Sequence, residues 1–322
     1  MMSEFDLIAR YFTRPPLKDG PVRLGVGDDC ALIAPPVGEE LAISTDMLVE
    51  GRHFFAGADP YQLGHKCLAV NLSDLAAMGA KPLGFTLALA LPSIDEAWLA
   101  SFSAGMLALA DAHHIELIGG DTTKGPLTIS ITVLGSVPPS MALRRDAALA
   151  GDDLWVSGSL GDARLALAML QGALSIDSTL AEAAELRLHR PTPRVLLGLA
   201  LRGIAHAAID ISDGLMGDLG HILKRSGTGA LINADALPCG PALMQQPLVT
   251  RRAYALNGGD DYELCFSAPP GLREAVRTAA LDSATPVARI GCITAETELV
   301  VTDANGQALK IFADSFDHFK HS

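Results

Sequence analysis

The sequence has few cysteines, and their spacing excludes two kinds of site. The five, Cys30, Cys67, Cys239, Cys265 and Cys292, stand singly and include no CxxC pair. An odd number of scattered thiols indicates neither a disulfide framework nor a thiolate metal site. We therefore interpret all five as small core residues.

Positive charge and long hydrophobic runs are also scarce. The 24 Lys and Arg residues are outnumbered by 37 Asp and Glu, which gives a formal net charge of −13. The absence of a basic stripe argues against nucleic acid or an anionic membrane as a partner. No stretch approaches the roughly 20 apolar residues that span a bilayer, and the first six residues lack the features of a signal peptide. The sequence predicts a cytoplasmic protein without a membrane partner.

Two common nucleotide-binding signatures are missing. Neither a Walker-type GxxxxGK(S/T) loop nor a glycine-rich dinucleotide fingerprint occurs. If the chain binds a nucleotide, several Mg²⁺ ions must neutralise the phosphates in place of a loop lysine. Lys124, Arg144 and Arg145 are candidates for direct phosphate contacts. Each of them, taken singly, is nearly as well explained as a solvated surface side chain.

What the sequence does contain is a series of aspartates in short sites flanked by glycine or hydroxyl residues. They are Asp28, Asp29, Asp46, Asp74, Asp121, Asp210, Asp213, Asp260 and Asp261. Carboxylates beside apolar runs are costly to bury unless a cation neutralises them, and their hard oxygen atoms suit Mg²⁺. The pattern predicts a protein that handles phosphates with several magnesium ions.

Length and hydropathy predict two domains of mixed α/β or α+β class. With 322 residues, of which 49% are hydrophobic, the chain can bury a substantial core. Strand and helix signals alternate through the first half, and Val137-Pro138-Pro139 ends a long strand candidate. We place the boundary near 138–150 and the domains at 1–140 and 141–322.

The patterns also predict individual elements. The expected strands are 22–26, 41–45, 85–91, 127–137, 154–157, 207–211, 262–267, 287–292 and 299–302. The expected helices are 60–79 with Asp59 as N-cap, one that starts at a capping box on Ser93 and runs toward His113, and 163–171, 180–189, 194–202 and 213–225.

Two acids in the first half have competing interpretations. Asp46 follows the expected strand 41–45, where it can bind a ligand at a strand end or simply start a turn; from this stretch alone the turn is favoured. Asp74 shares a helix face with Asn71 among apolar residues. It can bind a metal, the favoured interpretation, or pair with Lys66 in the core.

Three further acids follow expected strands. Asp121 comes after Gly119-Gly120, which allows close approach of the backbone to a ligand and places a carboxylate for a cation. Asp210 and Ser212 point to one side at a strand-to-helix junction, and we favour metal ligation for Asp210. Asp213 can equally bind a metal or cap the following helix.

Taken together, these motifs resemble the thiamine-monophosphate kinases. The match covers essentially the whole chain in order and spacing. The motifs that carry it are Gly27-Asp28-Asp29-Cys30-Ala31, Ser44-Thr45-Asp46, the helix 71–79, Gly119-Gly120-Asp121-Thr122-Thr123, residues 209–215, residues 259–264 and the terminal Phe316-Asp317-His318-Phe319.

The resemblance implies an activity and a fold. The activity is ATP-dependent phosphorylation of thiamine monophosphate to thiamine diphosphate, the last step in making that cofactor. The fold is the two-domain architecture shared with aminoimidazole ribonucleotide synthetase. In that architecture the N-terminal sheets of two subunits form a dimer-spanning β-barrel, so the resemblance also implies a homodimer.

The resemblance further implies residue roles. Metal ligands would be Asp29, Thr45, Asp46, Asp74, Asp121, Asp210 and Asp213, with Ser44 beside them. ATP contacts would be Gly120, Asp121, Arg145 and Ser212, and substrate contacts would be His53, Asp260 and Phe316. Catalysis would depend on Asp46, Asp121 and Arg145.

Two positions depart from the family pattern. Asp260 stands where the family commonly has Glu, so its carboxylate is one methylene shorter and its substrate contact is longer or bridged by water. An aromatic residue that some members place near Ala104 for the adenine is absent here.

Other functions remain open at this point. Aminoimidazole ribonucleotide synthetase, selenophosphate synthetase and the hydrogenase maturation enzyme share the superfamily. The last two depend on a reactive cysteine or selenocysteine near the N-terminus or at the C-terminus, whereas this chain has no cysteine before Cys30 and ends in Lys320-His321-Ser322. A non-catalytic protein that binds divalent metal or nucleotide would also explain the acids.

Overall fold

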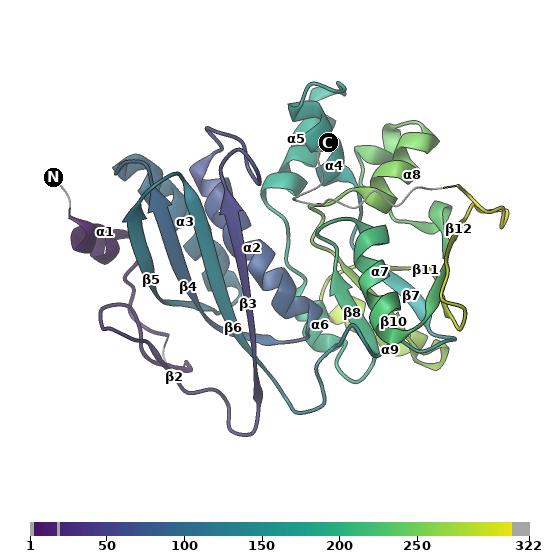
Figure 1. The fold of residues 1–322 in the computed structure, drawn as a ribbon, viewed down its shortest axis with the longest axis horizontal. Coiled ribbons are helices and arrows are strands. Elements are labelled where there is room, and N and C mark those ends of the chain that lie inside the picture. The colour runs from purple at the N-terminus through teal and green to yellow at the C-terminus, as the bar shows by residue number, and fades with distance from the viewer. Residues whose placement is uncertain (1–2, 18–19, 311–322) are drawn as a thin grey trace. The chain divides into compact units, whose positions relative to one another are not determined.

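A computed structural model of the chain describes residues 3–17 and 20–310 (Figure 1). It divides into two compact units. The first comprises Met1–Leu75 and Ala80–Ser140, and the second comprises Ala76–Gly79 and Met141–Ser322. Each unit combines a sheet with helices, so the predicted two-domain, mixed α/β class is confirmed. Phe316 lies outside the described residues.

The N-terminal unit is built on a four-stranded sheet with strand order β3-β6-β4-β5. β6 pairs antiparallel with both β3 and β4, and β5 runs parallel to β4. The unit also contains helix α1 and a short hairpin of β1 and β2. The bounds are α1 Glu4–Tyr11, β1 Val22–Leu24, β2 Leu32–Ile33, β3 Glu40–Val49, β4 Lys81–Leu91, β5 Glu116–Lys124 and β6 Thr128–Val137.

Side chains alternate between the two faces of this sheet. On β6, Ile129 and Ile131 are buried, whereas Ser130 and Thr132 are only partly buried. The buried face is covered by helices α2 (Pro60–Ala77) and α3 (Glu96–Ala112) (Figure 1). One face of the sheet therefore carries the core, as is common in sheets with antiparallel strands.

Helices α2 and α3 cross with their backbones in contact. A Cβ atom on Gly64 would lie 2.1 Å from the carbonyl oxygen of Phe102, and one on Gly105 would lie 1.9 Å from that of Tyr61. No side chain fits at either distance. Glycine at both positions therefore sets the separation of the two helices.

The C-terminal unit is built, among its described residues, on a six-stranded sheet with order β12-β9-β11-β7-β10-β8. Neighbouring strands are antiparallel except for β12 and β9. Every residue of β7, β8 and β10 is buried, so both faces of the sheet are covered at these strands. The strands are β7 Asp153–Ser157, β8 Ala207–Asp210, β9 Gly229–Asn233, β10 Leu264–Ala268, β11 Val287–Thr294 and β12 Leu299–Thr302.

Helices and short 3-10 turns connect these strands. The core of the unit includes Leu154 and Val156 of β7, Ile209 of β8 and Leu219 of α7. The helices are α4 Asp162–Leu170, α5 Ser178–His189, α6 Val195–Ala200, α7 Leu215–Ser226, α8 Leu248–Asn257 and α9 Arg273–Asp282, and the 3-10 turns are Ala234–Ala236, Leu243–Gln245 and Pro270–Leu272.

Two predicted helix starts are wrong. The N-cap of α3 is Asp95, whose carboxylate accepts the N–H groups of Ala97 and Trp98, rather than Ser93. Helix α7 begins after Gly214, which has a φ of 109° and no capping side chain, so Asp213 is not its N-cap. The cap of α3 thus lies two residues closer to the helix than predicted, and α7 begins without a side-chain cap.

Two acids expected at strand ends lie inside strands. Asp46 pairs with Ile131 in the middle of β3, so the turn interpretation is wrong. Asp121 pairs with Ala88 inside β5. In both places the neighbouring strand continues to pair through the polar residues. Pairing between strands, rather than the polar residues that suggest an end in the sequence, therefore decides where each strand ends.

The prediction for the cysteines is correct only in part. Cys67 and Cys265 are buried, but Cys30 is exposed in the connection between β1 and β2. Within residues 3–17 and 20–310, no helix is both long and apolar enough to cross a membrane.

The glycine contact between α2 and α3 gives a stability prediction. Gly105→Ala should lower the free energy of unfolding by about 1–3 kcal/mol, because the new methyl group forces the helices apart. Gly220→Ala is the matched control, since Gly220 lies in α7 with no atom within 4 Å of its added Cβ.

The control should raise stability by up to about 1 kcal/mol through helix propensity alone. Thermal unfolding followed by circular dichroism measures both changes. Equal stabilisation by the two substitutions would show that α2 and α3 do not touch at Gly105.

Candidate functional site

In the N-terminal unit, polar side chains of β3 and α2 meet on the buried face of the sheet. The Ser44 hydroxyl donates a hydrogen bond of 2.5 Å to Asp74. The Asn71 side chain accepts the N–H of Asp46 at 3.1 Å and donates to the carbonyl of Cys67 at 2.9 Å. The structure thus brings Ser44 into contact with Asp74 and holds the backbone of Asp46 against Asn71, which fixes the strand against the helix.

Thr45 lies on the other side of the same strand. Its hydroxyl forms a 2.8 Å hydrogen bond with that of Thr132 on β6. Because side chains alternate along a strand, Thr45 points away from the face that carries Ser44 and Asp46. The structure does not bring its side chain to the group around Asp74.

Asp121 is positioned by an unusual glycine. Gly120 has a φ of 151°, and a Cβ there would lie 1.8 Å from the carbonyl oxygen of Leu87. Only glycine permits this approach of β5 to β4. The carboxylate of Asp121 that follows is exposed.

Asp46 and Asp121 lie on the two outer strands of the N-terminal sheet, β3 and β5. The register places Asp46, Ile131, Leu87 and Gly120 in one line across the sheet. Asp121 follows Gly120, so within one chain its backbone lies about three strand spacings, roughly 14 Å, from that of Asp46.

Asp29 and His53 lie in loops of the N-terminal unit. Asp29 is exposed in the connection between β1 and β2, where its N–H donates to Asp28. In the loop after β3, Nδ1 of His53 accepts the N–H of Val49 at 3.0 Å. An accepting Nδ1 leaves the proton of the neutral ring on Nε2, so His53 can act as a donor there.

In the C-terminal unit, the site residues gather where β8 leads into α7. Asp210 is buried at the end of β8. The carboxylate of Asp218, one turn into α7, accepts the N–H groups of Ser212 and Asp213 at 3.0 and 3.1 Å. Burial raises the pKa of Asp218 to about 7.

A second loop packs against this junction. Asp260 donates its N–H to the carbonyl of Ser212, and Tyr262 donates to that of Ile211, both at 2.8 Å. Asp260 and Tyr262 have φ angles of 66° and 50°, which strains the backbone of non-glycine residues. These angles also explain why β10 begins at Leu264 rather than at residue 262.

A buried ion-pair network holds the far end of this loop. Glu263 is fully buried and pairs with Arg194, at 2.5 and 2.6 Å, and with Arg187 at 2.8 Å. It also accepts a hydrogen bond from Ser157. Asp261 accepts the N–H of Gly161, and burial raises its pKa well above the ordinary value. The strained segment is therefore anchored immediately after Asp260.

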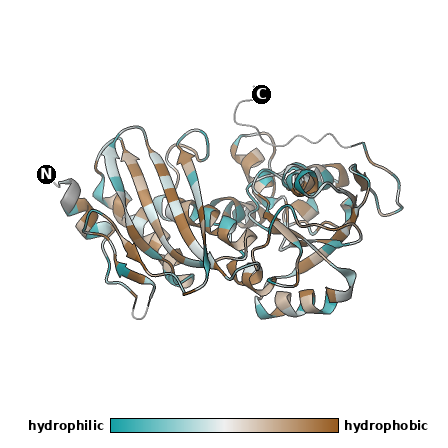
Figure 2. Cartoon of the chain, turned by 60° about the horizontal axis from the view of Figure 1, so that its bottom comes forward, coloured by the Kyte–Doolittle hydropathy of each residue, from teal (hydrophilic) through white to brown (hydrophobic). Residues whose placement is uncertain are grey.

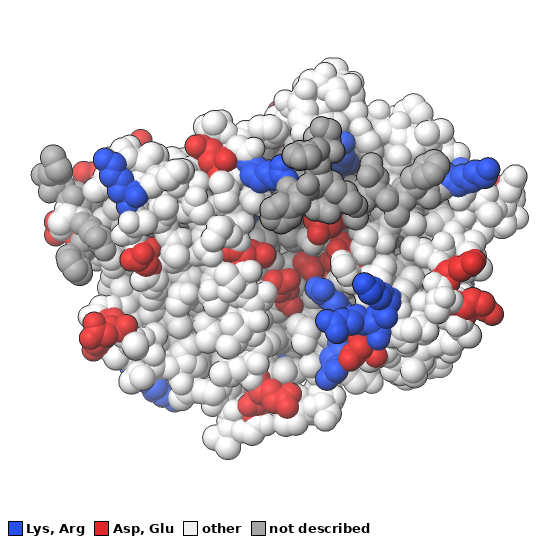
Figure 3. All heavy atoms as spheres, in the orientation of Figure 1, with Lys and Arg blue, Asp and Glu red and all other residues white. Residues whose placement is uncertain are grey.

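The arginines before β7 differ in their partners. Arg144 is paired with Asp146, whereas Arg145 forms no ion pair with any described residue. Arg145 lies close enough to Asp218 to favour its charged form. Arg225 also lies near Asp146. Figure 3 shows that basic side chains gather on one surface of the molecule. An anion could be held there by Arg145.

The sequence did not point to three residues that hold these loops in place. They are Asp218 and the arginines Arg187 and Arg194. An acid in the first turns of a helix was a usable signal for Asp218. No local signal could identify the two arginines, because their partner Glu263 lies about 70 residues away along the chain.

The oxygen donors fit magnesium that is bound together with phosphates. Among the described residues, no group of three or more His, Cys, Asp or Glu side chains is arranged to hold a metal. Mg²⁺ is usually held by one or two carboxylates and completed by substrate phosphates and water. The separate placements of Asp46 and Asp121 on the N-terminal sheet agree with that mode of binding.

Comparison with known proteins identifies the family of this chain. Residues 27–137 match the family described as "AIR synthase related protein, N-terminal domain". Residues 150–304 match the family described as "AIR synthase related protein, C-terminal domain". The thiamine-monophosphate kinase of Salmonella typhimurium is 47% identical over 98% of both chains. That of Haemophilus influenzae is 44% identical over 100% of this chain and 99% of its own.

Solved structures agree with these relatives. A thiamine-monophosphate kinase from Stenotrophomonas maltophilia superposes with a TM-score of 0.84 and 49% identity, over 90% of this chain and 92% of that one. AaThiL in complex with AMPPCP and TMP has a TM-score of 0.76 and 29% identity, over 88% of each chain. Escherichia coli HypE, a hydrogenase maturation protein, is 22% identical with a TM-score of 0.77, and so shares the fold. The chain belongs to the thiamine-monophosphate kinase family of AIR synthase related proteins.

Proposed function

We propose that this chain transfers the γ-phosphoryl group of ATP to thiamine monophosphate and releases thiamine diphosphate and ADP. The observation that carries the proposal is near-full-length identity of 47% to a thiamine-monophosphate kinase. The fold shared with AaThiL, which binds AMPPCP and TMP, supports it. We also propose that the activity takes place in the cytoplasm, where ATP is available.

The chemistry requires no general base. The attacking atom is a phosphate oxygen of thiamine monophosphate, and with a second pKa of about 6 this group is largely ionised at neutral pH. The oxygen attacks the γ-phosphorus in line, and the bond to the leaving ADP oxygen breaks. The protein must therefore bring two anions together, and no residue needs to form a covalent intermediate.

Acids of the N-terminal unit position the metals in this proposal. Bound Mg²⁺ would screen the repulsion between the two anions and stabilise the leaving oxygen. Asp46 and Asp74, with Ser44, form one ligand group, and Asp121 forms another. Thr45 contributes through its backbone, because its side chain faces away. Asp29 supplies a ligand from the exposed connection between β1 and β2.

The C-terminal unit supplies ATP contacts and further ligands. Asp210 and Asp213 bind metal, and Gly120 of the N-terminal unit brings a backbone close to the nucleotide. Ser212 is held by Asp218 and by the loop that carries Asp260. Arg145 stabilises the charge that develops on the transferred group. Catalysis then depends on Asp46, Asp121 and Arg145.

Thiamine monophosphate contacts His53, Asp260 and Phe316 in this proposal. His53 donates from Nε2 to a substrate oxygen, as the hydrogen bond on Nδ1 requires. The strained φ of Asp260 sets the direction of its carboxylate, which is shorter than the Glu common in the family. Phe316, outside the described residues, packs on the thiamine rings.

We propose that residues 1–140 form the domain for metal and ATP binding and for dimerisation, and that residues 141–322 bind ATP and substrate. The face of β3 opposite α2 and α3 carries Leu41, Ile43 and Met47, which are 49%, 63% and 57% exposed. Figure 2 shows hydrophobic positions along these strands. A second copy of the chain would cover this face and complete a barrel across a homodimer.

The first test is the reaction itself. Incubation with ATP, Mg²⁺ and thiamine monophosphate should yield thiamine diphosphate, measured by chromatography. Asp46→Asn should lower kcat by about 100-fold or more, because a metal ligand loses its charge. Asp95→Asn is the control, since asparagine caps α3 equally well. Wild-type turnover in Asp46→Asn would remove Asp46 from the metal ligands.

A second test concerns the substrate. His53→Ala or Phe316→Ala should raise the KM for thiamine monophosphate by about tenfold and leave the KM for ATP unchanged, because each removes one substrate contact. His221→Ala, at an exposed position of α7, serves as the control. An unchanged KM for thiamine monophosphate would make His53 and Phe316 structural residues.

The dimer can be tested by light scattering after size exclusion. The wild type should show about twice the chain mass of 33.6 kDa. Ile43→Glu should yield monomers, because it places a charge in the buried face of the barrel. Leu281→Glu changes a still more exposed apolar residue of α9 and should remain dimeric. A monomeric wild type would contradict the proposal.

A further inference from the structure

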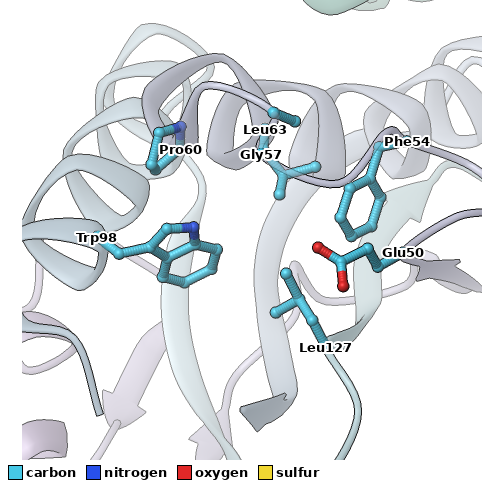
Figure 4. Close-up of a pocket in the computed structure, with 8 residues that line it drawn as sticks. Glu50, Phe54, Gly57, Pro60, Leu63, Trp98 and Leu127 are labelled. Atoms are coloured by element: carbon cyan, nitrogen blue, oxygen red, sulfur yellow. The ribbon is translucent and has the colours of Figure 1, made fainter. Parts of the chain in front are cut away.

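The two described residues that are proposed to contact the substrate, His53 and Asp260, are held in different ways. The loop around His53 closes on its own backbone, because its N–H donates to the carbonyl of Val49 at 3.0 Å. In the same loop the N–H of Gly51 donates to the carbonyl of Phe54 at 2.8 Å, and Phe54 lines a small pocket of the N-terminal unit (Figure 4). The segment that carries Asp260 is held instead by groups from distant parts of the C-terminal unit.

The segment 260–262 contains two strained residues. Asp260 and Tyr262 have φ angles of 66° and 50°, in the left-handed region that is unfavourable for a residue with a Cβ atom. Between them, the buried carboxylate of Asp261 accepts the N–H of Gly161 through both oxygens, at 3.0 and 2.9 Å. Strained angles persist only where the surrounding structure holds them. The contacts of this segment must therefore include the groups that keep it strained.

One peptide group sets the conformation of Tyr262. The carbonyl of Asp261 and the N–H of Tyr262 share a peptide plane and point in opposite directions. The N–H donates to the carbonyl of Ile211 at 2.8 Å, and the carbonyl accepts from Nη2 of Arg187 at 3.1 Å. If this plane turned over, the φ of Tyr262 would change from 50° to about −130°, in the broadly allowed β region. The strain favours that turn, and the two hydrogen bonds oppose it.

Arg187 and Arg194 both pair with Glu263, but they hold different atoms. Arg194 directs Nε and Nη2 to the two carboxylate oxygens of Glu263, at 2.6 and 2.5 Å. Arg187 directs Nη2 alone to Oε1 of Glu263, at 2.8 Å, and to the carbonyl of Asp261. Its Nε is buried and has no hydrogen-bond partner within the described part of the chain. Arg187 thus forgoes the two-pronged geometry that suits a carboxylate and bridges Glu263 to the peptide before Tyr262.

Glu263 gives this bridge a fixed end. It is fully buried, accepts the hydroxyl of Ser157 on β7 at 2.6 Å and is held from another side by Arg194. A guanidinium bound to such a carboxylate cannot follow the carbonyl of Asp261 if the peptide turns over. Because Asp261 is buried, the turn would leave its carbonyl without the donor, which costs free energy. Arg187 therefore opposes the relaxation of the strained segment.

We propose that Arg187 is a positioning residue for Asp260, because it fixes the peptide plane after Asp261 and with it the backbone from which the Asp260 carboxylate projects. The inference rests on the proposed function, in which Asp260 contacts thiamine monophosphate, and adds a residue that acts through Asp260. The neighbouring ATP contact, Ser212, keeps its own hydrogen bond to Asp218. The loss of Arg187 should thus weaken the binding of thiamine monophosphate and spare that of ATP.

The first experiment compares two matched variants. Arg187→Met and Arg194→Met each remove one guanidinium from Glu263 and change the net charge equally, so both should lower the Tm. Arg187→Met should raise the KM for thiamine monophosphate about tenfold and leave the KM for ATP within about twofold of the wild type. Arg194→Met should leave both KM values within about twofold. An unchanged KM for thiamine monophosphate in Arg187→Met, or an equal rise in both variants, would overturn the inference.

The second experiment separates positioning from a general structural effect. In an Asp260→Ala background, Arg187→Met should cause no further rise in the KM for thiamine monophosphate, because no carboxylate remains to be oriented. Effects of the two substitutions that multiply would contradict the inference. If Arg187→Met does not fold, Arg187→Lys takes its place. Lysine keeps a charge beside Glu263 but is one bond shorter, so it cannot reach both acceptors and the KM should still rise; an unchanged KM would again contradict the inference.

Hydrogen exchange tests the role of Arg187 without any substrate and so distinguishes the two proposals. Mass spectrometry of a peptide that covers residues 258–265 should show faster amide exchange in Arg187→Met than in Arg194→Met, because the Tyr262 amide is released when its peptide turns over. Equal exchange would show that Arg187 does not hold the segment. A wild type that makes no thiamine diphosphate would overturn the proposed function alone. A wild type that makes it, with an unchanged KM in Arg187→Met, would overturn only the positioning role.

Discussion

The energetic cost of removing carboxylates from water governs the arrangement of both units. Four acids near the site have a hydrogen-bond donor or a basic partner: Ser44 donates to Asp74, backbone amides donate to Asp218 and Asp261, and two arginines surround Glu263. Each bond compensates part of the lost hydration. These four carboxylates are therefore held in fixed positions by the protein itself.

The sequence was sufficient to predict the local structure where a residue's own chemistry determines it. Asp59 with Pro60 correctly marked the start of α2, and Val137 with the following prolines correctly marked the end of β6. The glycines before Asp121 indicated a close backbone approach, which Gly120 makes against Leu87. Membership of the family followed from the order of the motifs, none of which is specific alone.

The sequence was insufficient to predict the local structure where segments far away along the chain determine it. Asp46 lies inside β3 because β6, some 85 residues later, continues the ladder through it. Asp213 does not cap α7, because the helix begins after Gly214 and the N–H of Asp213 itself donates to Asp218. Glu263 is buried only because Arg187 and Arg194 reach it from α5 and the segment before α6. Such pairings depend on tertiary structure, which no local pattern encodes.

The glycine crossing of α2 and α3 has a consequence for how the N-terminal unit can move. Tyr61, whose carbonyl touches Gly105, lies in the first turn of α2, and Phe102, whose carbonyl touches Gly64, stacks on Trp98. With the helix backbones already in contact, the two helices cannot approach each other further, and tight packing resists their separation. A displacement of one helix should therefore carry the other with it.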